Sequence, residues 1–231
     1  LRALAMAERP PILQEQRSSL NRRRPGLWIT AGSVLQLIAA FLPHPEVFMA
    51  TEPQAKIQAI AASQVGWNLQ AILFPIAFLM VTVGFGLLIR TFSLKSARQA
   101  AGVATALSAL AVLLWLPISV GRLQVGSTIQ EVLRSYATGD PFSMDGGFGW
   151  AFWPYTFTTL LSILAMGLAF WAGRTKRLLG LGIAIACLLI LVAFIPLMGD
   201  WPPLLSYVLT LVLGIALLLP RKKTSLNQTN E

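Results

Sequence analysis

The stretch "WNLQAILFPIAFLMVTVGFGLLI", residues 67–89, has no charged side chain in 23 positions, and it decides the class of fold. An α-helix needs about 20 consecutive apolar residues to cross the hydrocarbon core of a bilayer. The whole chain has a matching composition, because 55% of its 231 residues are hydrophobic and only 12% are charged. The mean hydropathy is +0.68. Ordinary soluble domains carry about 25% charged residues, so the sequence predicts an integral membrane protein.

Five further apolar runs accompany this one and define the expected architecture. We expect an all-α, polytopic protein with a bundle of six transmembrane helices, at residues 27–45, 67–89, 101–119, 150–172, 178–198 and 201–220. The predicted organisation is a basic N-terminal segment (1–26), the six-helix transmembrane domain (27–220) and a tail (221–231). The first run could also be the apolar region of a signal peptide, but Phe48 stands where cleavage requires a small residue. We therefore expect the first run to remain as a helix.

The charged residues supply the orientation. All 18 Lys and Arg and all 9 Asp and Glu lie outside the six runs, as expected if a charge at a helix centre costs about 2.5–3.5 kcal/mol on insertion scales. On the opposite side from the N-terminus we find only Lys56, Arg122 and Arg134. The other fifteen cations share the side of the N-terminus: Arg2, Arg9, Arg17, Arg22, Arg23, Arg24, Arg90, Lys95, Arg98, Arg174, Lys176, Arg177, Arg221, Lys222 and Lys223. Because Lys and Arg mark cytoplasmic loops, we expect a plasma (cytoplasmic) membrane protein with both termini in the cytoplasm.

The net charge of +9, and the way the cations are distributed, help to predict the partners of the chain. Its cations form short clusters at the ends of apolar runs, unlike a basic patch with interleaved aromatic residues, which would indicate nucleic acid. We expect membrane lipids as partners, since anionic headgroups attract such clusters, and no nucleic acid. Small residues four apart, such as Gly102 with Ala106 and Gly180 with Ala184, allow close helix packing. They predict that the third and fifth helices are buried, or that the chain forms a homo-oligomer or joins other membrane subunits.

Aromatic residues gather in "GDPFSMDGGFGWAFWPYTF", residues 139–157. Tryptophan prefers the headgroup level of a bilayer, where its ring is half buried and its N–H stays wet. All seven tryptophans lie at or near the ends of the runs, so we interpret them as interfacial: Trp28, Trp67, Trp115, Trp150, Trp153, Trp171 and Trp201. The alternative, that residues 139–157 form a binding loop, stays open.

Two segments outside the runs have helical patterns. In "STIQEVLRSY", residues 127–136, apolar side chains recur at helical spacing, and in "TEPQAKIQAI", residues 51–60, Thr51 can cap a helix. The sequence predicts short amphipathic helices in these two extracytoplasmic loops. They are either supports at the bilayer surface or the lid of an outward-facing vestibule.

Most kinds of chemistry lack the residues that they need. Ion-coupled carriers usually have ionisable residues within their spans, and the six runs contain none. The chain has one histidine, His44, and one cysteine, Cys187, so we expect no cofactor, no metal and no catalytic residues. Hydroxyl and amide side chains within the runs are expected to hydrogen-bond between helices or to backbone carbonyls; they are Ser33, Gln36, Thr82, Thr105, Ser108, Thr158, Thr159, Ser162, Ser206 and Thr210.

Two classes of function remain, and we expect the first of them, with the second as the alternative. The first is a non-catalytic membrane component, an accessory, assembly or lipid-interacting subunit of a membrane complex. The second is a passive carrier or receptor for an uncharged or lipid-like small molecule. A solidly packed bundle would favour the first, and a polar or hollow path would favour the second. The candidate residues of an outer vestibule are Trp67, Arg122, Asp145, Trp150, Trp153, Asp200 and Trp201.

Overall fold

The computed structural model describes residues 11–174, 176–194 and 202–219, with the side chains of residues 23–174, 176–193 and 203–219. Within these ranges the chain consists of helices and loops, so the expected all-α class is confirmed. The elements in chain order are α1 (Pro11–Ala40), α2 (Glu46–Met49), α3 (Pro53–Ala62), α4 (Gln64–Ile89), α5 (Lys95–Ser127), α6 (Ile129–Ala137), the 3-10 turn η2 (Gly149–Ala151), α7 (Phe152–Ala172), α8 (Arg177–Leu189), the π-helical turn η3 (Ile190–Phe194) and α10 (Pro202–Leu218).

Three of the described helical segments are long and apolar enough to cross a membrane. They are α4, α5 and the segment Gly149–Ala172, which comprises η2 and α7. The two apolar helices near the C-terminus, α8 with η3 and α10, are shorter. The chain is therefore a multi-pass membrane protein by the length and composition of these helices.

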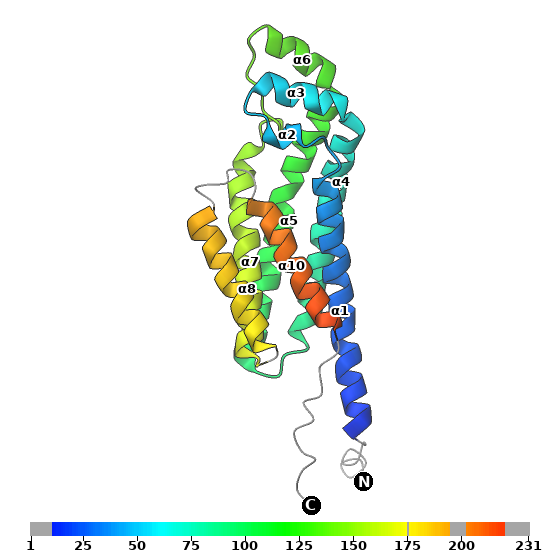
Figure 1. Cartoon of the computed structure of the whole chain (residues 1–231), viewed down its shortest axis with the longest axis vertical. Helices are drawn as coiled ribbons and strands as arrows, with labels where there is room; N and C mark the ends of the chain where they lie inside the picture. The colour runs from blue at the N-terminus through cyan, green and yellow to red at the C-terminus, as the bar shows by residue number, and fades with distance from the viewer. Residues whose placement is uncertain (1–10, 175, 195–201, 220–231) are drawn as a thin grey trace, which may run out of the picture.

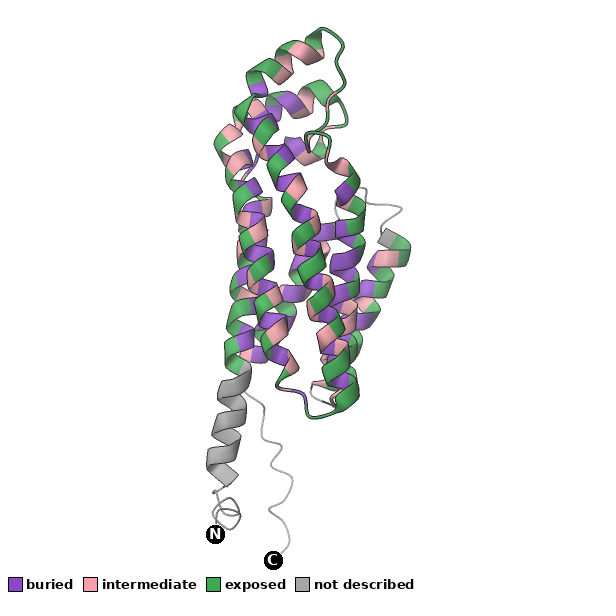
Figure 2. Cartoon of the chain, turned by 180° about the vertical axis from the view of Figure 1, so that it is seen from behind, coloured by how far each residue is buried: buried purple, intermediate pink, exposed green. Residues whose placement is uncertain are grey.

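Five helices form a ring around a common axis. Around this ring α4 packs against α1 and α5, α5 against α7, and α10 lies between α1 and α7. Figure 2 shows buried positions along the inner faces of the helices and exposed positions along the outer faces. The exposed residues include many leucines, isoleucines and valines. The bundle thus has an interior of its own and an apolar outer surface.

The shorter apolar helix α8 lies outside the ring and packs mainly against α7 (Figure 1). Its close contact uses Gly180, where an added Cβ would collide with the carbonyl of Gly167 and with Phe170. The expectation that the third and fifth helices are the buried ones is wrong: 33% of the apolar part of α5 is buried, less than in α4 or α7, and α8 lies outside the ring. Small residues allow close packing but do not require it, since a Cβ added at Gly102 or Gly182 would meet no neighbouring atom within 4 Å.

Two helices extend well beyond the apolar runs that predicted them. The run 101–119 lies within α5, which extends from Lys95 to Ser127. The first helix, α1, begins at Pro11, before the run 27–45, and ends at Ala40, so residues 41–45 of that run do not belong to it. Hydropathy identifies the part of a helix that can lie in hydrocarbon. A helix can continue beyond that part, because its backbone hydrogen bonds are still made and its side chains contact water or protein there.

A cap covers one end of the ring. It comprises α2, α3, α6, the loop between α6 and η2, the N-terminal end of α4 and the C-terminal end of α5 (Figure 1). The apolar faces of α3 and α6 meet in a separate hydrophobic core that includes Ile57, Ile60, Trp67 and Ile129. The two amphipathic helices expected in the loops are present, and their apolar faces pack on protein within this cap.

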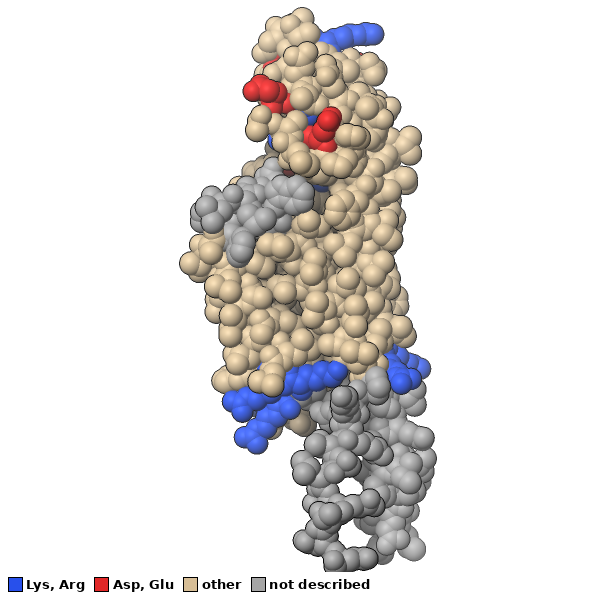
Figure 3. Space-filling model, in the orientation of Figure 1, with Lys and Arg blue, Asp and Glu red and all other residues tan. Residues whose placement is uncertain are grey.

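Charge is segregated along the long axis. The five acidic residues whose side chains the structure describes all lie in the cap: Glu46, Glu52, Glu131, Asp140 and Asp145. At the opposite end of the ring, described cations cluster: Arg23, Arg24, Arg90, Lys95, Arg98, Arg174, Lys176 and Arg177. On the face that Figure 3 shows, no charged side chain is visible among the described residues between the two ends. We refer to the two ends as the cap end and the basic end.

Candidate functional site

A cavity of about 260 Å³ lies on the axis of the ring, directly beneath the cap. All five ring helices contribute to its wall, together with the segment after α1 and the loop before η2. The lining residues are Ala40, Phe41, Pro43, Pro45, Phe48, Gln70, Phe74, Trp115, Arg122, Met144, Asp145, Gly149, Phe152, Trp153, Pro203, Leu204 and Tyr207. Aromatic rings and prolines therefore form most of the wall, and Arg122 and Asp145 are its charged members.

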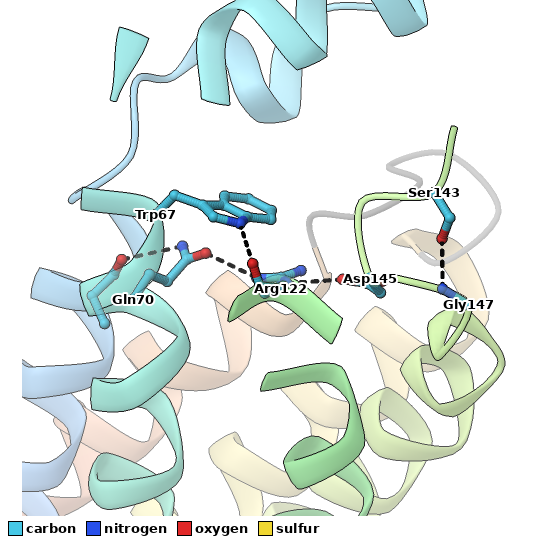
Figure 4. Close-up of polar contacts among 7 residues, drawn as sticks. Trp67, Gln70, Arg122, Ser143, Asp145 and Gly147 are labelled. Atoms are coloured by element: carbon cyan, nitrogen blue, oxygen red, sulfur yellow. Dashed lines mark hydrogen bonds and ion pairs between the residues drawn. The ribbon is translucent and has the colours of Figure 1, made fainter. Parts of the chain in front are cut away.

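Arg122 organises the polar side of the cavity (Figure 4). Its Nε donates to Oδ1 of Asp145 at 2.8 Å, and its Nη1 donates to Oε1 of Gln70 at 2.9 Å. The side chains of Arg122 and Asp145 are only 4% and 10% exposed. A buried charge is tolerated where it is paired and hydrogen-bonded, and the pair leaves the wall of the cavity without net charge.

Two tryptophans complete the surroundings of Arg122. The guanidinium carbon lies 5.0 Å from the ring centroid of Trp67 and 4.9 Å from that of Trp115, both within the range of a cation–π contact. The indole N–H of Trp67 donates to the backbone carbonyl of Arg122 at 2.8 Å. Gln70 in turn donates to the carbonyl of Ala39 at 3.2 Å, which links this group to the end of α1.

The loop before η2 reaches Arg122 because two glycines allow close approach. A Cβ at Gly121 would collide with the carbonyl of Asp145, and a Cβ at Gly146 would lie 2.9 Å from the Cα of Gly121. Gly146 and Gly147 have φ of +56° and +90°, which glycine adopts readily. The hydroxyl of Ser143 accepts from the amide of Gly147 at 3.3 Å (Figure 4), so the turn that presents Asp145 is also held locally.

The inner wall of the cavity is an aromatic cluster. Phe74 contacts Trp115 and Tyr207, with ring centroids 5.1 and 5.7 Å apart. The hydroxyl groups of Tyr155 and Tyr207 lie 3.0 Å apart, so that one donates to the other. These packed rings give the cavity a rigid floor.

The structure brings together four of the residues that were expected to form the vestibule. Arg122, Asp145 and Trp153 line the cavity, and Trp67 lies behind Arg122. Trp150 is 66% exposed and is not part of the lining. Asp200 and Trp201 lie outside the described residues.

The interfacial interpretation of the tryptophans is wrong for Trp67 and Trp115. Their exposed fractions are 0% and 2%, so neither ring is half buried at a wet surface. By contrast, Trp28, Trp150 and Trp171 are 43%, 66% and 41% exposed. Position near the end of an apolar run is shared by both groups, and only the direction of each side chain separates them.

Three important residues of the cavity were missed by the sequence reasoning: Gln70, Phe74 and Tyr207. Gln70 was a detectable signal, because it is an amide within an apolar run and it shares a helix face with Trp67 and Phe74 at helical spacing. Tyr207 lies on α10, and nothing in its local sequence indicates a contact with α4 or α7.

Few of the described residues at this site could bind a metal ion or act as a nucleophile. Among the described residues, no three His, Cys, Asp or Glu side chains lie close enough to hold a metal ion. His44 and Glu46 are 3.8 Å apart at the surface, with side chains more than half exposed. The arrangement can instead enclose an apolar molecule and offer it polar groups on one side.

Comparisons with family models, with curated proteins and with solved structures found no match. The function of the chain is therefore argued from the geometry of this cavity.

Proposed function

We propose that this protein is a receptor or passive carrier for an uncharged, largely apolar small molecule, which binds in the cavity beneath the cap. The observation that carries the proposal is this cavity, which five helices line and whose wall consists mostly of aromatic rings and prolines. Small-molecule sites are typically concave and mostly apolar, with a few convergent polar groups. The cavity has these features, although its volume of about 260 Å³ suits a small ligand.

The charge of the wall restricts the ligand. Arg122 and Asp145 already neutralise each other at 2.8 Å, so a charged ligand would have to separate a buried ion pair or add an unpaired charge beside it, and either would be costly. An uncharged ligand can use the aromatic faces and leave the pair intact. Lipid-like molecules belong to this class.

The alternative function, an accessory subunit of a membrane complex, has less support. Its main requirement is an apolar flank for a partner, and the exposed apolar side chains on α4, α5 and α8 meet that requirement. A lipid-facing surface needs the same side chains. The flank therefore does not distinguish a protein partner from lipid, whereas the cavity favours a small-molecule ligand.

The orientation that we propose has six spans, α1, α4, α5, α7, α8 with η3, and α10, with the basic end in the cytoplasm and the cap outside. The positive-inside rule supports it, because the described cations other than Lys56, Arg122 and Arg134 lie at the basic end. Arg122 is 24 residues beyond Arg98 on the same helix, about 36 Å at 1.5 Å per residue. Since the hydrocarbon core is about 30 Å thick, the cavity then lies at the outer edge of the bilayer.

Native mass spectrometry after extraction in mild detergent tests the binding function. We expect a stoichiometric, uncharged small molecule on the wild-type protein and on Ile38→Phe, which alters an exposed position of α1. Ala40→Phe, two residues further along the same helix, adds a ring to the wall of the cavity and should lose the ligand while eluting as a folded protein. Recovery of the wild-type protein without a small molecule but with a stoichiometric protein subunit would contradict the proposal and support the accessory function.

A further inference from the structure

A second, smaller cavity lies deeper on the axis of the ring. Its volume is about 10 Å³, and its wall includes side chains from α1, α4, α5, α7 and α10. Tyr207 lines both cavities, so the deep cavity adjoins the floor of the outer one. The polar residues of its wall, besides Tyr207, are Gln36, Ser108, Thr159, Ser162, Ser206 and Thr210.

Two of these side chains have a buried oxygen without a hydrogen-bond partner. They are Oε1 of Gln36 and Oγ1 of Thr159, on residues that are 2% and 9% exposed. Leaving a buried donor or acceptor unsatisfied costs about 1–3 kcal/mol. Two such atoms on residues that line one small cavity indicate that a polar occupant belongs there.

The remaining hydroxyl groups define what that occupant must be. Ser162 donates to the carbonyl of Thr159 at 2.8 Å, Ser206 to that of Pro203 at 2.6 Å, and Thr210 to that of Tyr207 at 2.9 Å. Their hydrogens are thus engaged with backbone carbonyls, and each oxygen retains a lone pair.

Ser108 follows the same pattern. Thr82 donates to the carbonyl of Phe78 at 2.9 Å, so in the 2.7 Å contact between the two hydroxyls Ser108 is the donor. The wall of the deep cavity therefore presents mostly acceptors, and its occupant must be a hydrogen-bond donor.

We propose that the deep cavity is a binding site for one water molecule at the centre of the bundle, held between Gln36 of α1 and Thr159 of α7. A cavity of about 10–15 Å³ by this measure accommodates one water, and a buried water typically makes about three hydrogen bonds. No residue of the wall carries a formal charge, and a cation in mid-bundle would need such a counter-charge. Water is uncharged, donates two hydrogens and has the right size.

This site is independent of the ligand in the outer cavity. The water bridges two helices of the ring across its axis. Oε1 of Gln36 has no other partner among the described residues, and Oγ1 of Thr159 has only the hydroxyl group of Tyr155 nearby, outside good hydrogen-bond geometry. It also extends the polar groups of the outer cavity inward, through the paired hydroxyls of Tyr155 and Tyr207.

X-ray radiolytic footprinting of the full-length protein in detergent tests the site, because radiolysis of a bound water oxidises the side chains that surround it. Phe85 is 0% exposed and lines only the deep cavity, whereas Phe170 is 1% exposed and lines neither cavity. We expect Phe85 to be oxidised clearly faster than Phe170. The double variant Gln36→Leu with Thr159→Val should lower the rate at Phe85 to that at Phe170.

Thr105→Val is the matched control. Its hydroxyl donates to the carbonyl of Ala101 at 2.8 Å and lies outside the deep cavity, so the variant should leave the oxidation of Phe85 unchanged. Equal rates at Phe85 and Phe170 in the wild-type protein would overturn the proposal, and this comparison does not depend on the variants folding. An oxidation rate at Phe85 that persists in the folded double variant would also overturn it.

Discussion

Replacing Asp145 by asparagine removes one charge of the ion pair at the cap end and tests the role of Arg122 directly. The substitution keeps the shape of the side chain and one acceptor oxygen for the Nε of Arg122, which donates at 2.8 Å. What it removes is the countercharge of a guanidinium whose side chain is 4% exposed. The expected result is a marked loss of stability without a change of fold.

The magnitude follows from the burial of the pair. Removing one partner of a buried ion pair costs about 3–5 kcal/mol, because the other charge is left uncompensated. Arg122 keeps its bond to Gln70 and its contacts with Trp67 and Trp115, each cation–π contact being worth about 0.5–2 kcal/mol. We therefore expect the free energy of unfolding to fall by about 3 kcal/mol, at the lower end of that range.

Equilibrium unfolding in mixed micelles, with increasing sodium dodecyl sulfate, measures this change. Asp140→Asn is the matched control, since Asp140 lies in the same loop and is exposed; surface substitutions usually change stability by no more than about 0.5 kcal/mol. In a double-mutant cycle, Arg122→Met with Asp145→Asn should cost about 0.5–3 kcal/mol less than the sum of the two single variants. Additive losses, or a stability of Asp145→Asn equal to that of Asp140→Asn, would refute the argument.

Three further predictions concern packing, burial and orientation. Gly121→Ala should destabilise the protein by about 1–3 kcal/mol, because the added methyl group would collide with the carbonyl of Asp145. Gly102→Ala is the control, since a methyl group there would have no neighbouring atom within 4 Å. In the same unfolding assay it should be neutral or stabilising by up to about 1 kcal/mol. Cys187 is 0% exposed, so a thiol-reactive maleimide dye should label the wild-type protein only as it unfolds on heating, and fast labelling of the folded protein would show that the core is open. In a Cys187→Ala background, an impermeant maleimide applied to intact cells should label Gln54→Cys in the cap and not Ser96→Cys at the basic end; the reverse pattern would contradict the proposed orientation.

Much of the fold could be predicted because the solvent acts on each helix separately. Hydrocarbon excludes charge and requires every backbone group to be bonded within the helix, so the runs of uncharged residues predicted the helices α4, α5 and α7 almost directly. The amphipathic pattern of α6 was equally clear, since Ile129, Val132 and Leu133 fall on one face. The pattern could not say whether that face meets lipid or protein, and in the structure it packs in the cap core.

The candidate site was predicted only in part, because its residues come from segments that the sequence does not relate to one another. Arg122 and Asp145 could be proposed for a vestibule as charges near the ends of apolar runs. Their contact at 2.8 Å depends on Gly121 and Gly146 allowing the loop to approach α5. Tyr207 reaches the same cavity from a helix more than fifty residues further along the chain.

By itself the sequence determined the solvent in which this protein folds, its helical class and the segregation of its cations, because each of these follows from the local transfer free energy of side chains between water and hydrocarbon. Only the tertiary structure decided that five helices form a ring with α8 outside it, that Trp67 and Trp115 face inward, and that a cavity remains on the axis. Those features depend on which side chains from distant segments fill the space between helices, and shape complementarity of that kind has no signature within any single apolar run.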